Sequence, residues 1–296
     1  MPKSGLSSPA VSFHTLSMPS TTIFIASEPA IRLTGFALAF AVLVGLEFLS
    51  PARGVPHRFT RWRSNLGLIV AGTILLRLTF PVAAFGTAIW AEAHHVGLFH
   101  LVNLPYALAF LLSLIALDLL IYGQHVVSHH VPLLWRLHKV HHSDTDLDVT
   151  TALRFHPFEI ALSMMIKMAA VAGLGAPPLA VLTFEILLNA TAMFSHANIA
   201  LGPKADQLLR RVIVTPDMHR VHHSDVVTLQ NRNFGFNLSL WDRIFATYHS
   251  VDKAGLATMR IGLAGLDDSK PGRFFWSLIL PFLNNDTKSV ADGDKL

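Results

Sequence analysis

Long apolar stretches separated by short polar loops occupy the first two thirds of the chain. Residues 31–49 form an apolar run of about the length that crosses the ~30 Å hydrocarbon core of a bilayer. Residues 65–90 contain Pro81 and form either one kinked or tilted span or a span followed by an interfacial piece. Residues 101–122 are the third candidate span. Residues 158–194 are also apolar, apart from a Gly- and Pro-rich break at 173–178 that is typical of a helical hairpin. This pattern predicts an all-α, multi-pass membrane bundle.

The composition agrees with a membrane location. Hydrophobic residues make up 52% of the chain and charged residues only 14%, which is too apolar for an ordinary soluble domain. The net charge of +4 comes from Lys and Arg scattered over short loops, so we expect no nucleic-acid partner. The loop after the first span should face the cytoplasm by the positive-inside rule, because it carries Arg53, Arg58, Arg61 and Arg63.

Histidines are concentrated in three patterned elements. Of the 17 histidines, eleven lie between His125 and His223. The sequence around His138 is nearly repeated around His219. In each copy one His precedes a His pair by three and four residues, which places all three on one face of a helix. The third element is an earlier pair, His125 and His129, four residues apart. Together the three elements supply eight candidate metal ligands, which are His125, His129, His138, His141, His142, His219, His222 and His223.

Eight imidazoles exceed the needs of one ion, which takes about three to five protein ligands, so the pattern predicts two metal ions held between several helices. His196, at the end of the apolar hairpin, is a ninth candidate ligand. His130 should point away from its neighbour His129, and His156 precedes a proline, so neither is included. The alternative is that these histidines are surface or interfacial residues that only solvate the ends of the helices and bind no metal. Cysteine is absent, and imidazole donors alone suit iron, zinc, copper and nickel alike.

One carboxylate falls inside a predicted span. Asp118 lies in the third span, where an ionisable side chain is costly and usually functional. It precedes His125 by two helical turns, so both residues can face the same side. We therefore assign Asp118 to the catalytic site and expect it to orient a ligand imidazole through the second ring nitrogen.

The spacing of these histidines, with Asp118 before them and the elements at residues 233–235 and 241–247 after them, resembles the fatty acid hydroxylase superfamily, also called the sterol desaturase family. The resemblance covers about residues 101–249. It implies a membrane-bound, non-haem di-iron oxygenase that hydroxylates or desaturates a lipid such as a fatty acyl chain or a sterol. It further implies molecular oxygen as co-substrate and electrons from a separate donor, which would be a reductase, a ferredoxin or a cytochrome b5-like protein.

The chain divides into four parts on this interpretation. Residues 1–30, rich in Ser, Thr and Pro, are expected to form a disordered tail without a cleaved signal peptide. Residues 31–100 hold the first two spans, residues 101–249 the catalytic domain, and residues 250–296 a C-terminal interfacial segment and tail. Two spans separate the arginine-rich loop from His125, which predicts a helical cap with the histidine site on the cytoplasmic side.

Two other functions remain open from the residues alone. A membrane zinc-dependent hydrolase would activate water, but it usually adds carboxylate ligands and a carboxylate base, whereas the patterned positions here are nearly all imidazole. A metal-binding or transport protein would place its ligands near the middle of a span rather than at cytoplasmic helix ends. The histidine pattern therefore favours the oxygenase.

Overall fold

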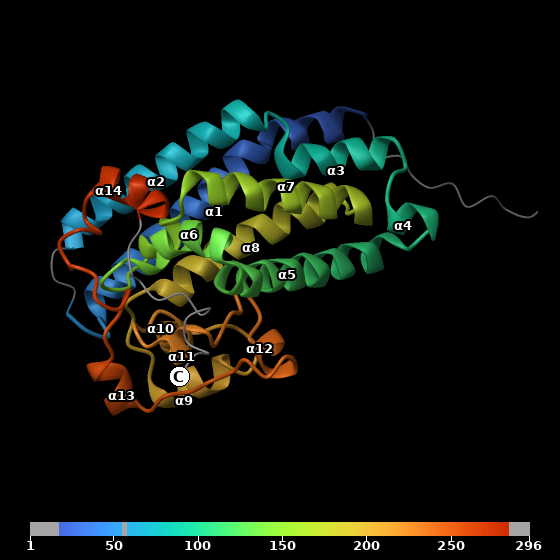
Figure 1. Cartoon of the computed structure of the whole chain (residues 1–296). Helices are drawn as coiled ribbons and strands as arrows, with labels where there is room; N and C mark the ends of the chain where they lie inside the picture. The colour runs from blue at the N-terminus through green and yellow to red at the C-terminus, as the bar shows by residue number, and fades with distance from the viewer. Residues whose placement is uncertain (1–17, 55–57, 284–296) are drawn as a thin grey trace, which may run out of the picture.

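The computed structural model describes residues 18–54 and 58–283, with side chains from residue 26 onwards (Figure 1). Within these residues the regular structure is helical, and strand pairing is confined to isolated bridges. This confirms the predicted all-α bundle. Its main helices are α1 (Met18–Leu49), α2 (Arg58–Thr79), α3 (Ala83–Ala93), α5 (Tyr106–His130), α7 (Pro157–Leu174) and α8 (Pro178–His196).

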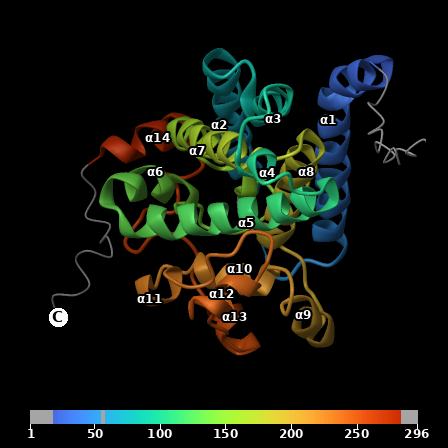
Figure 2. The same cartoon turned by 90° about the vertical axis from the view of Figure 1, so that its right-hand side faces the viewer.

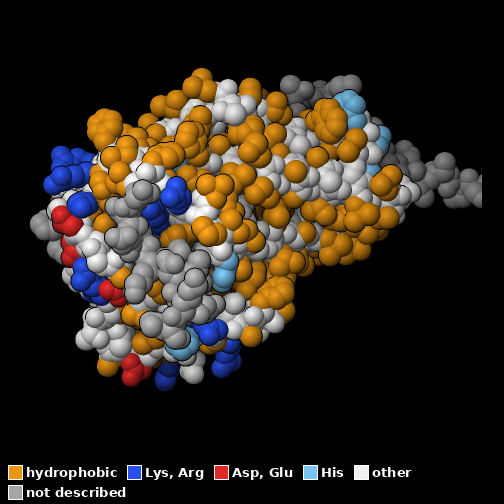
Figure 3. Space-filling view, in the orientation of Figure 1, with side chains coloured by type: hydrophobic (Ala, Val, Ile, Leu, Met, Phe, Trp, Pro, Cys, Tyr) orange, Lys and Arg blue, Asp and Glu red, His pale blue; other side chains and the backbone are white. Residues whose placement is uncertain are grey.

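The outer surface of the bundle is apolar. Five helical segments of the described chain are long and apolar enough to cross a membrane. Large hydrophobic side chains such as Leu38, Val70 and Leu111 are exposed on α1, α2 and α5. Figure 3 shows hydrophobic atoms over the bundle, whereas Lys, Arg, Asp and Glu gather at its lower left. Because water would not tolerate so continuous an apolar surface, the chain is an integral membrane protein, as predicted.

The predicted second span is not one helix. α2 ends at Thr79, and α3 begins at Ala83 after a bend that contains Pro81. Proline lacks the backbone N–H that would continue the helix, and Ala83 has a left-handed φ of 49°, so the chain turns sharply here. α3 then packs against α7 and α8.

The third span extends further than predicted. α5 continues to His130, so His125 and His129 lie on the last turns of this span rather than beyond it. The apolar hairpin that follows is confirmed. α7 ends at Leu174 and is followed by Gly175, whose φ of 70° suits a residue without a side chain, and α8 begins at Pro178. α8 packs against α1 and α5, and α7 packs against α2.

The N-terminal helix is longer than predicted. α1 begins at Met18, so residues 18–30 are helical where a disordered tail was expected. Residues 22–31 carry Ile, Phe and Ala and join the first span directly, so the helix continues through them, including Pro29. The rest of the predicted tail, residues 1–17, lies outside the described residues.

The C-terminal segment packs into the protein. It forms α14 (Phe274–Ile279) and the 3-10 helix η2 (Leu280–Phe282). An interfacial segment was predicted. Leu280 is fully buried in a cluster that also contains Val140, whereas Phe275 and Phe282 of the same segment are exposed. α14 packs against α2, which explains how so short a segment is held. The predicted tail at 284–296 lies outside the described residues.

Short helices form a cap beside the C-terminal end of α5 (Figures 1 and 2). The arginine-rich loop reaches the same end, because Arg61 at the start of α2 pairs with Asp144. The predicted helical cap is therefore present. It comprises α9 (Pro203–Leu209), α10 (Pro216–His222), α11 (Val227–Gln230), α12 (Leu240–Ile244) and α13 (Lys253–Thr258). The remaining elements are α4 (Leu98–Leu101), α6 (Pro132–His142) and the 3-10 helix η1 (Thr151–Leu153).

Candidate metal centre

Nine histidines meet where the bundle joins the cap, and they form two groups. Within each group, one ring nitrogen from every member lies within 4.8 Å of the others. All nine side chains are buried. We call these the first group, which is His125, His129, His138, His142 and His222, and the second group, which is His141, His196, His219 and His223.

Each three-histidine motif is divided between the groups. His138 and His142 are four residues apart on α6 and share one face, whereas His141 points into the second group. The other motif is divided in the reverse sense, because its middle histidine, His222, belongs to the first group and its outer two to the second. Neither motif therefore supplies a complete group by itself.

The ring nitrogens of the second group are spaced as ligands of one ion. The Nε2 atom of His196 lies 3.1 Å from that of His141, 3.0 Å from that of His219 and 3.2 Å from that of His223. Two nitrogens bound at the usual ~2.0–2.1 Å from one metal ion lie roughly 3.0–3.4 Å apart. The four imidazoles therefore fit one ion without rearrangement.

The first group shows the same fit. The Nε2 atoms of His125 and His138 are 3.1 Å apart. Those of His129, His142 and His222 are buried and have no hydrogen-bond partner among the described residues. A buried ring nitrogen without a partner is costly unless something binds it. The residues present thus fit a second ion.

Burial keeps the histidines of α6 and of the cap neutral. It lowers the pKa of His141, His142, His219 and His223 well below the usual value, and the neighbouring imidazoles lower it further. Burial likewise lowers the pKa of His222 to about 3. A neutral imidazole has the free lone pair that a metal ion requires. At neutral pH these side chains can bind metal without losing a proton.

Several of the rings are held from behind by their other nitrogen, as His138 and His125 illustrate. His138 Nδ1 donates to Oε1 of Glu159, 2.6 Å away, in the first turn of α7. His125 Nδ1 donates to the backbone carbonyl of Phe234 at 2.8 Å. Such contacts fix the orientation of each ring and direct Nε2 towards the shared centre.

Sequence reasoning missed Glu159. Its side chain is buried, and its Oε2 atom has no partner among the described residues. The available signal was an ionisable residue inside an apolar span, which is the signal that singled out Asp118. His156, which was left out of the ligand set, belongs to neither group, and its side chain caps α7 at Phe158.

Asp118 contacts different partners from those predicted. Its Oδ2 atom accepts hydrogen bonds from Trp241 Nε1 at 2.8 Å and from the backbone N–H of Leu238 at 3.3 Å, and not from an imidazole. Two helical turns amount to about 10 Å of rise, which is too far for Asp118 to reach His125. It instead anchors the segment whose Phe234 carbonyl holds His125.

Asp242 secures the same segment. It accepts hydrogen bonds from the backbone N–H groups of Phe234 at 2.7 Å and Gly235 at 2.9 Å. A Cβ on Gly235 would lie 2.8 Å from both Asp242 Oδ2 and the Leu238 carbonyl oxygen, so only glycine fits here. The elements that follow the histidine motifs in sequence therefore position a ligand candidate.

Two carboxylate variants should lower metal occupancy in a fixed order. Glu159→Gln removes the charged acceptor that touches His138 and should lower metal affinity about ten- to a hundredfold. Asp118→Asn acts only through the backbone segment that holds His125, so we expect it to lower metal affinity about tenfold or less. Metal content of the purified variants measures both, with exposed Glu92→Gln as the control. A larger loss in Asp118→Asn than in Glu159→Gln would contradict this order.

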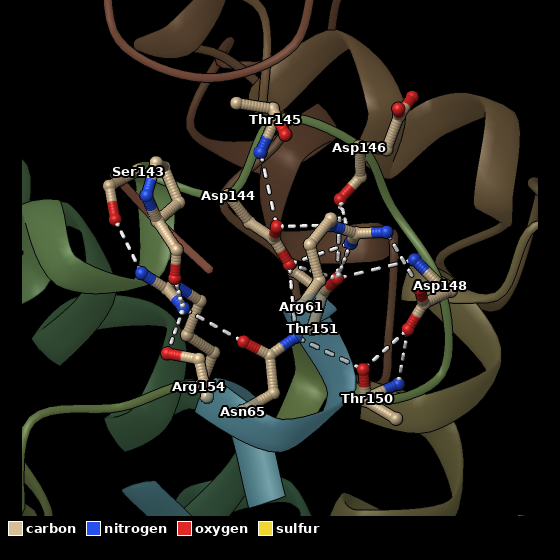
Figure 4. Close-up of polar contacts among 12 residues, drawn as sticks. Arg61, Asn65, Ser143, Asp144, Thr145, Asp146, Asp148, Thr150, Thr151 and Arg154 are labelled. Atoms are coloured by element: carbon tan, nitrogen blue, oxygen red, sulfur yellow. Dashed lines mark hydrogen bonds and ion pairs between the residues drawn. The ribbon is translucent and has the colours of Figure 1, made fainter. Parts of the chain in front are cut away.

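A buried ionic network fixes the loop after α6 (Figure 4). Arg61 binds both carboxylate oxygens of Asp144, at 2.5 and 2.7 Å, and Oδ2 of Asp148 at 2.8 Å. Burial alone would raise the pKa of Asp144, but the Arg61 guanidinium outweighs it and holds this pKa at about 2. Because Asp144 follows His142 by two residues, the network fixes the end of the helix that carries three histidines. Arg61 therefore does more than signal topology.

Arg154 reinforces this region from a fully buried position. It donates to the Val140 carbonyl at 2.8 Å, to Ser143 Oγ at 2.9 Å and to Asn65 Oδ1 at 2.8 Å. A further hydrogen bond of 2.8 Å reaches Ser277 Oγ in α14. A buried cation is tolerated only when its N–H groups are satisfied. Arg154 thus joins α2, α6 and α14 into one support.

A cavity of about 480 Å³ runs from the histidines into the membrane part of the bundle. His125, His138 and Glu159 border it at the cap end, and apolar residues such as Ile69 and Leu188 form much of its wall. This volume is typical of a site that encloses a small-molecule ligand. Only the first group borders the cavity within the described residues, so a bound molecule would approach that group.

Comparison with known proteins gives a family and several relatives. Residues 110–247 match the family model described as fatty acid hydroxylase. Ornithine lipid hydroxylase OlsE of Rhizobium tropici is 30% identical over 72% of this chain and 61% of its own length. Alkylglycerol monooxygenase of Homo sapiens is 29% identical over 52% of this chain and 34% of its own, and that of Danio rerio is 32% identical over 51% and 33%.

The chain spans 61% of the length of the first relative and about a third of the other two. No solved structure gives a significant match. The matched region contains Asp118 and all nine histidines of the two groups. This agrees with the resemblance found in the sequence. Residues 110–247 are therefore similar to fatty acid hydroxylases, and the relatives that the chain resembles are named as a lipid hydroxylase and as monooxygenases.

Proposed function

We propose that this protein is a non-haem di-iron oxygenase that hydroxylates or desaturates a lipid, using molecular oxygen and external electrons. The observation that carries this proposal is the pair of buried histidine groups at the end of a cavity within a membrane bundle. The relatives support it, because they are named as a lipid hydroxylase and as monooxygenases.

The nine histidines would hold two iron ions, one in each group. When bound, the iron pair supplies the oxidising power that an unreactive C–H bond requires. The other residues provide placement. Glu159 and the Phe234 carbonyl hold the rings of His138 and His125 in position. The apolar cavity wall keeps a hydrocarbon chain beside the first group and keeps bulk water away.

The histidine site would face the cytoplasm. Arg53 and Arg61 of the arginine-rich loop lie at the same end of the bundle as the histidines, since Arg53 donates to the Met259 carbonyl and Arg61 pairs with Asp144. The positive-inside rule assigns that end to the cytoplasm. A reductase, a ferredoxin or a cytochrome b5-like protein would then deliver electrons at the cap.

Cysteine labelling should separate the two ends of the bundle, because the chain has no cysteine of its own. Thr145→Cys, at the cap end, should resist a membrane-impermeant thiol reagent in intact cells and react once the cells are opened. Ala93→Cys, exposed at the end of α3, should react in intact cells. Labelling of Thr145→Cys from outside would contradict the cytoplasmic placement and leave the metal assignment untouched.

Metal analysis and oxygen uptake test the function itself. The purified protein should contain about two iron ions per chain and should consume oxygen when given a reductant and a membrane lipid extract. Bound zinc, with lipid hydrolysis and no oxygen uptake, would contradict the oxygenase and support a hydrolase.

A further inference from the structure

Charged side chains line the cavity at the end away from the histidines. They lie within the candidate membrane spans, where an ionisable group is costly and usually functional. They come from four helices, α1, α2, α7 and α8, that surround the cavity. We call them the charged cluster, which is Glu28, Arg32, Arg77, Lys167 and Glu185.

Ion pairing accounts for four of these five residues. Arg32 pairs with Glu28 and, at 2.6 Å, with Glu185, and Lys167 also pairs with Glu185. Arg77 has no ion pair among the described residues, although it borders the same cavity. Within the charged cluster three cations thus face two carboxylates, and the third carboxylate of the cavity wall, Glu159, lies at the other end beside His138. Arg77 therefore has no carboxylate partner at its own end of the cavity.

The charged cluster and the histidines lie at opposite ends of the cavity. Lys167 and Glu159 are eight residues apart on α7, so about 12 Å of helix axis separates them. Ile160, Met164 and Leu188 form an apolar wall between them. The separation is somewhat less than ~15 Å, the half-thickness of a bilayer core that one lipid chain occupies. An amphiphile can therefore reach both ends at once.

The cavity reaches the lipid-facing surface beside the charged cluster. Arg77 and Val82 border the cavity and are exposed. α1, which carries Arg32, packs against α8, whereas α2, which carries Arg77, packs against α7. A lipid can enter sideways from the bilayer at this point without passing through water.

We propose, on the basis of the proposed function, that the charged cluster binds the polar group of the substrate and that the substrate is an anionic lipid. A carboxylate or phosphate lies against Arg77 and Arg32, and the hydrocarbon chain extends through the apolar part to His125 and His138. A neutral sterol or hydrocarbon would leave Arg77 uncompensated. Oxidation then falls on the hydrocarbon chain, at the histidine end of the cavity, rather than beside the polar group.

Photolabelling of the full-length protein in nanodiscs tests this site without metal or turnover. The probe is hexadecanoic acid with a diazirine near the middle of its chain, and the comparison is hexadecanol with the same diazirine. The acid should label the cavity wall at residues 155–164 about three- to tenfold more than the alcohol, as expected for a partly exposed charge contact. Displacement by unlabelled hexadecanoate or by hexadecyl phosphate supports the site and identifies the anionic group. Displacement by neither overturns it.

A matched pair of variants isolates the charge. Arg77→Gln should lower labelling by the acid to that of the alcohol, whereas Arg63→Gln, exposed on the same helix but outside the cavity, should leave it unchanged. Equal labelling by acid and alcohol, or unchanged labelling in Arg77→Gln, would overturn the anionic site. Labelling as expected in a protein without oxygenase activity would uphold the site and count against the proposed function.

Discussion

His222→Ala is expected to abolish oxygenase activity while the protein stays in the membrane. His222 supplies a nitrogen to the first group, and its ring is held by the Arg232 carbonyl at 2.8 Å. Its removal opens the ligand shell of one ion only, so bound iron should fall towards about one per chain. Because both ions would act together on the substrate, partial loading should not leave partial turnover. Iron content and oxygen uptake of the purified variant measure this.

His130→Ala is the matched control. His130 lies next to His129 on α5, but its side chain is exposed and belongs to neither group. Its ring contacts the Val126 carbonyl. It should keep full activity and both ions. Full activity in His222→Ala would show that the assignment of two ions to nine histidines is wrong.

Arg61→Met should lower the free energy of unfolding by about 3–5 kcal/mol, as is usual when one partner of a buried ion pair is removed. The variant leaves the carboxylates of Asp144 and Asp148 buried without the guanidinium that pairs with both. Methionine retains much of the side-chain volume, so the loss reports charge rather than packing. Thermal unfolding of the purified protein in nanodiscs measures it.

Arg63→Met is the control for this change. Arg63 lies two residues further along α2 and is exposed, so its replacement should change the free energy of unfolding by less than about 0.5 kcal/mol. Equal melting temperatures for the two variants would mean that the Arg61 network does not stabilise the loop after α6. A destabilised Arg61→Met protein should also bind iron less tightly, because the loop after α6 fixes the end of the helix that carries His142.

The helical bundle was largely predictable because a bilayer imposes a length and an apolar surface on every span. Hydropathy located the first span and the hairpin, but it could not show that α2 ends before Pro81 and that α3 is a separate helix packed against α7 and α8. Hydropathy averages over a window, whereas one proline changes direction locally.

The sequence by itself determined which side chains are candidate ligands, because the spacing of His138, His141 and His142 places three imidazoles on one helical surface. Only the tertiary structure decided how those imidazoles are shared. His141 meets His196, which lies 55 residues away, and Asp118 meets Trp241 rather than a histidine. Helical periodicity describes neighbours within one helix, whereas these contacts depend on which distant segments pack together, and nothing local in a sequence encodes that.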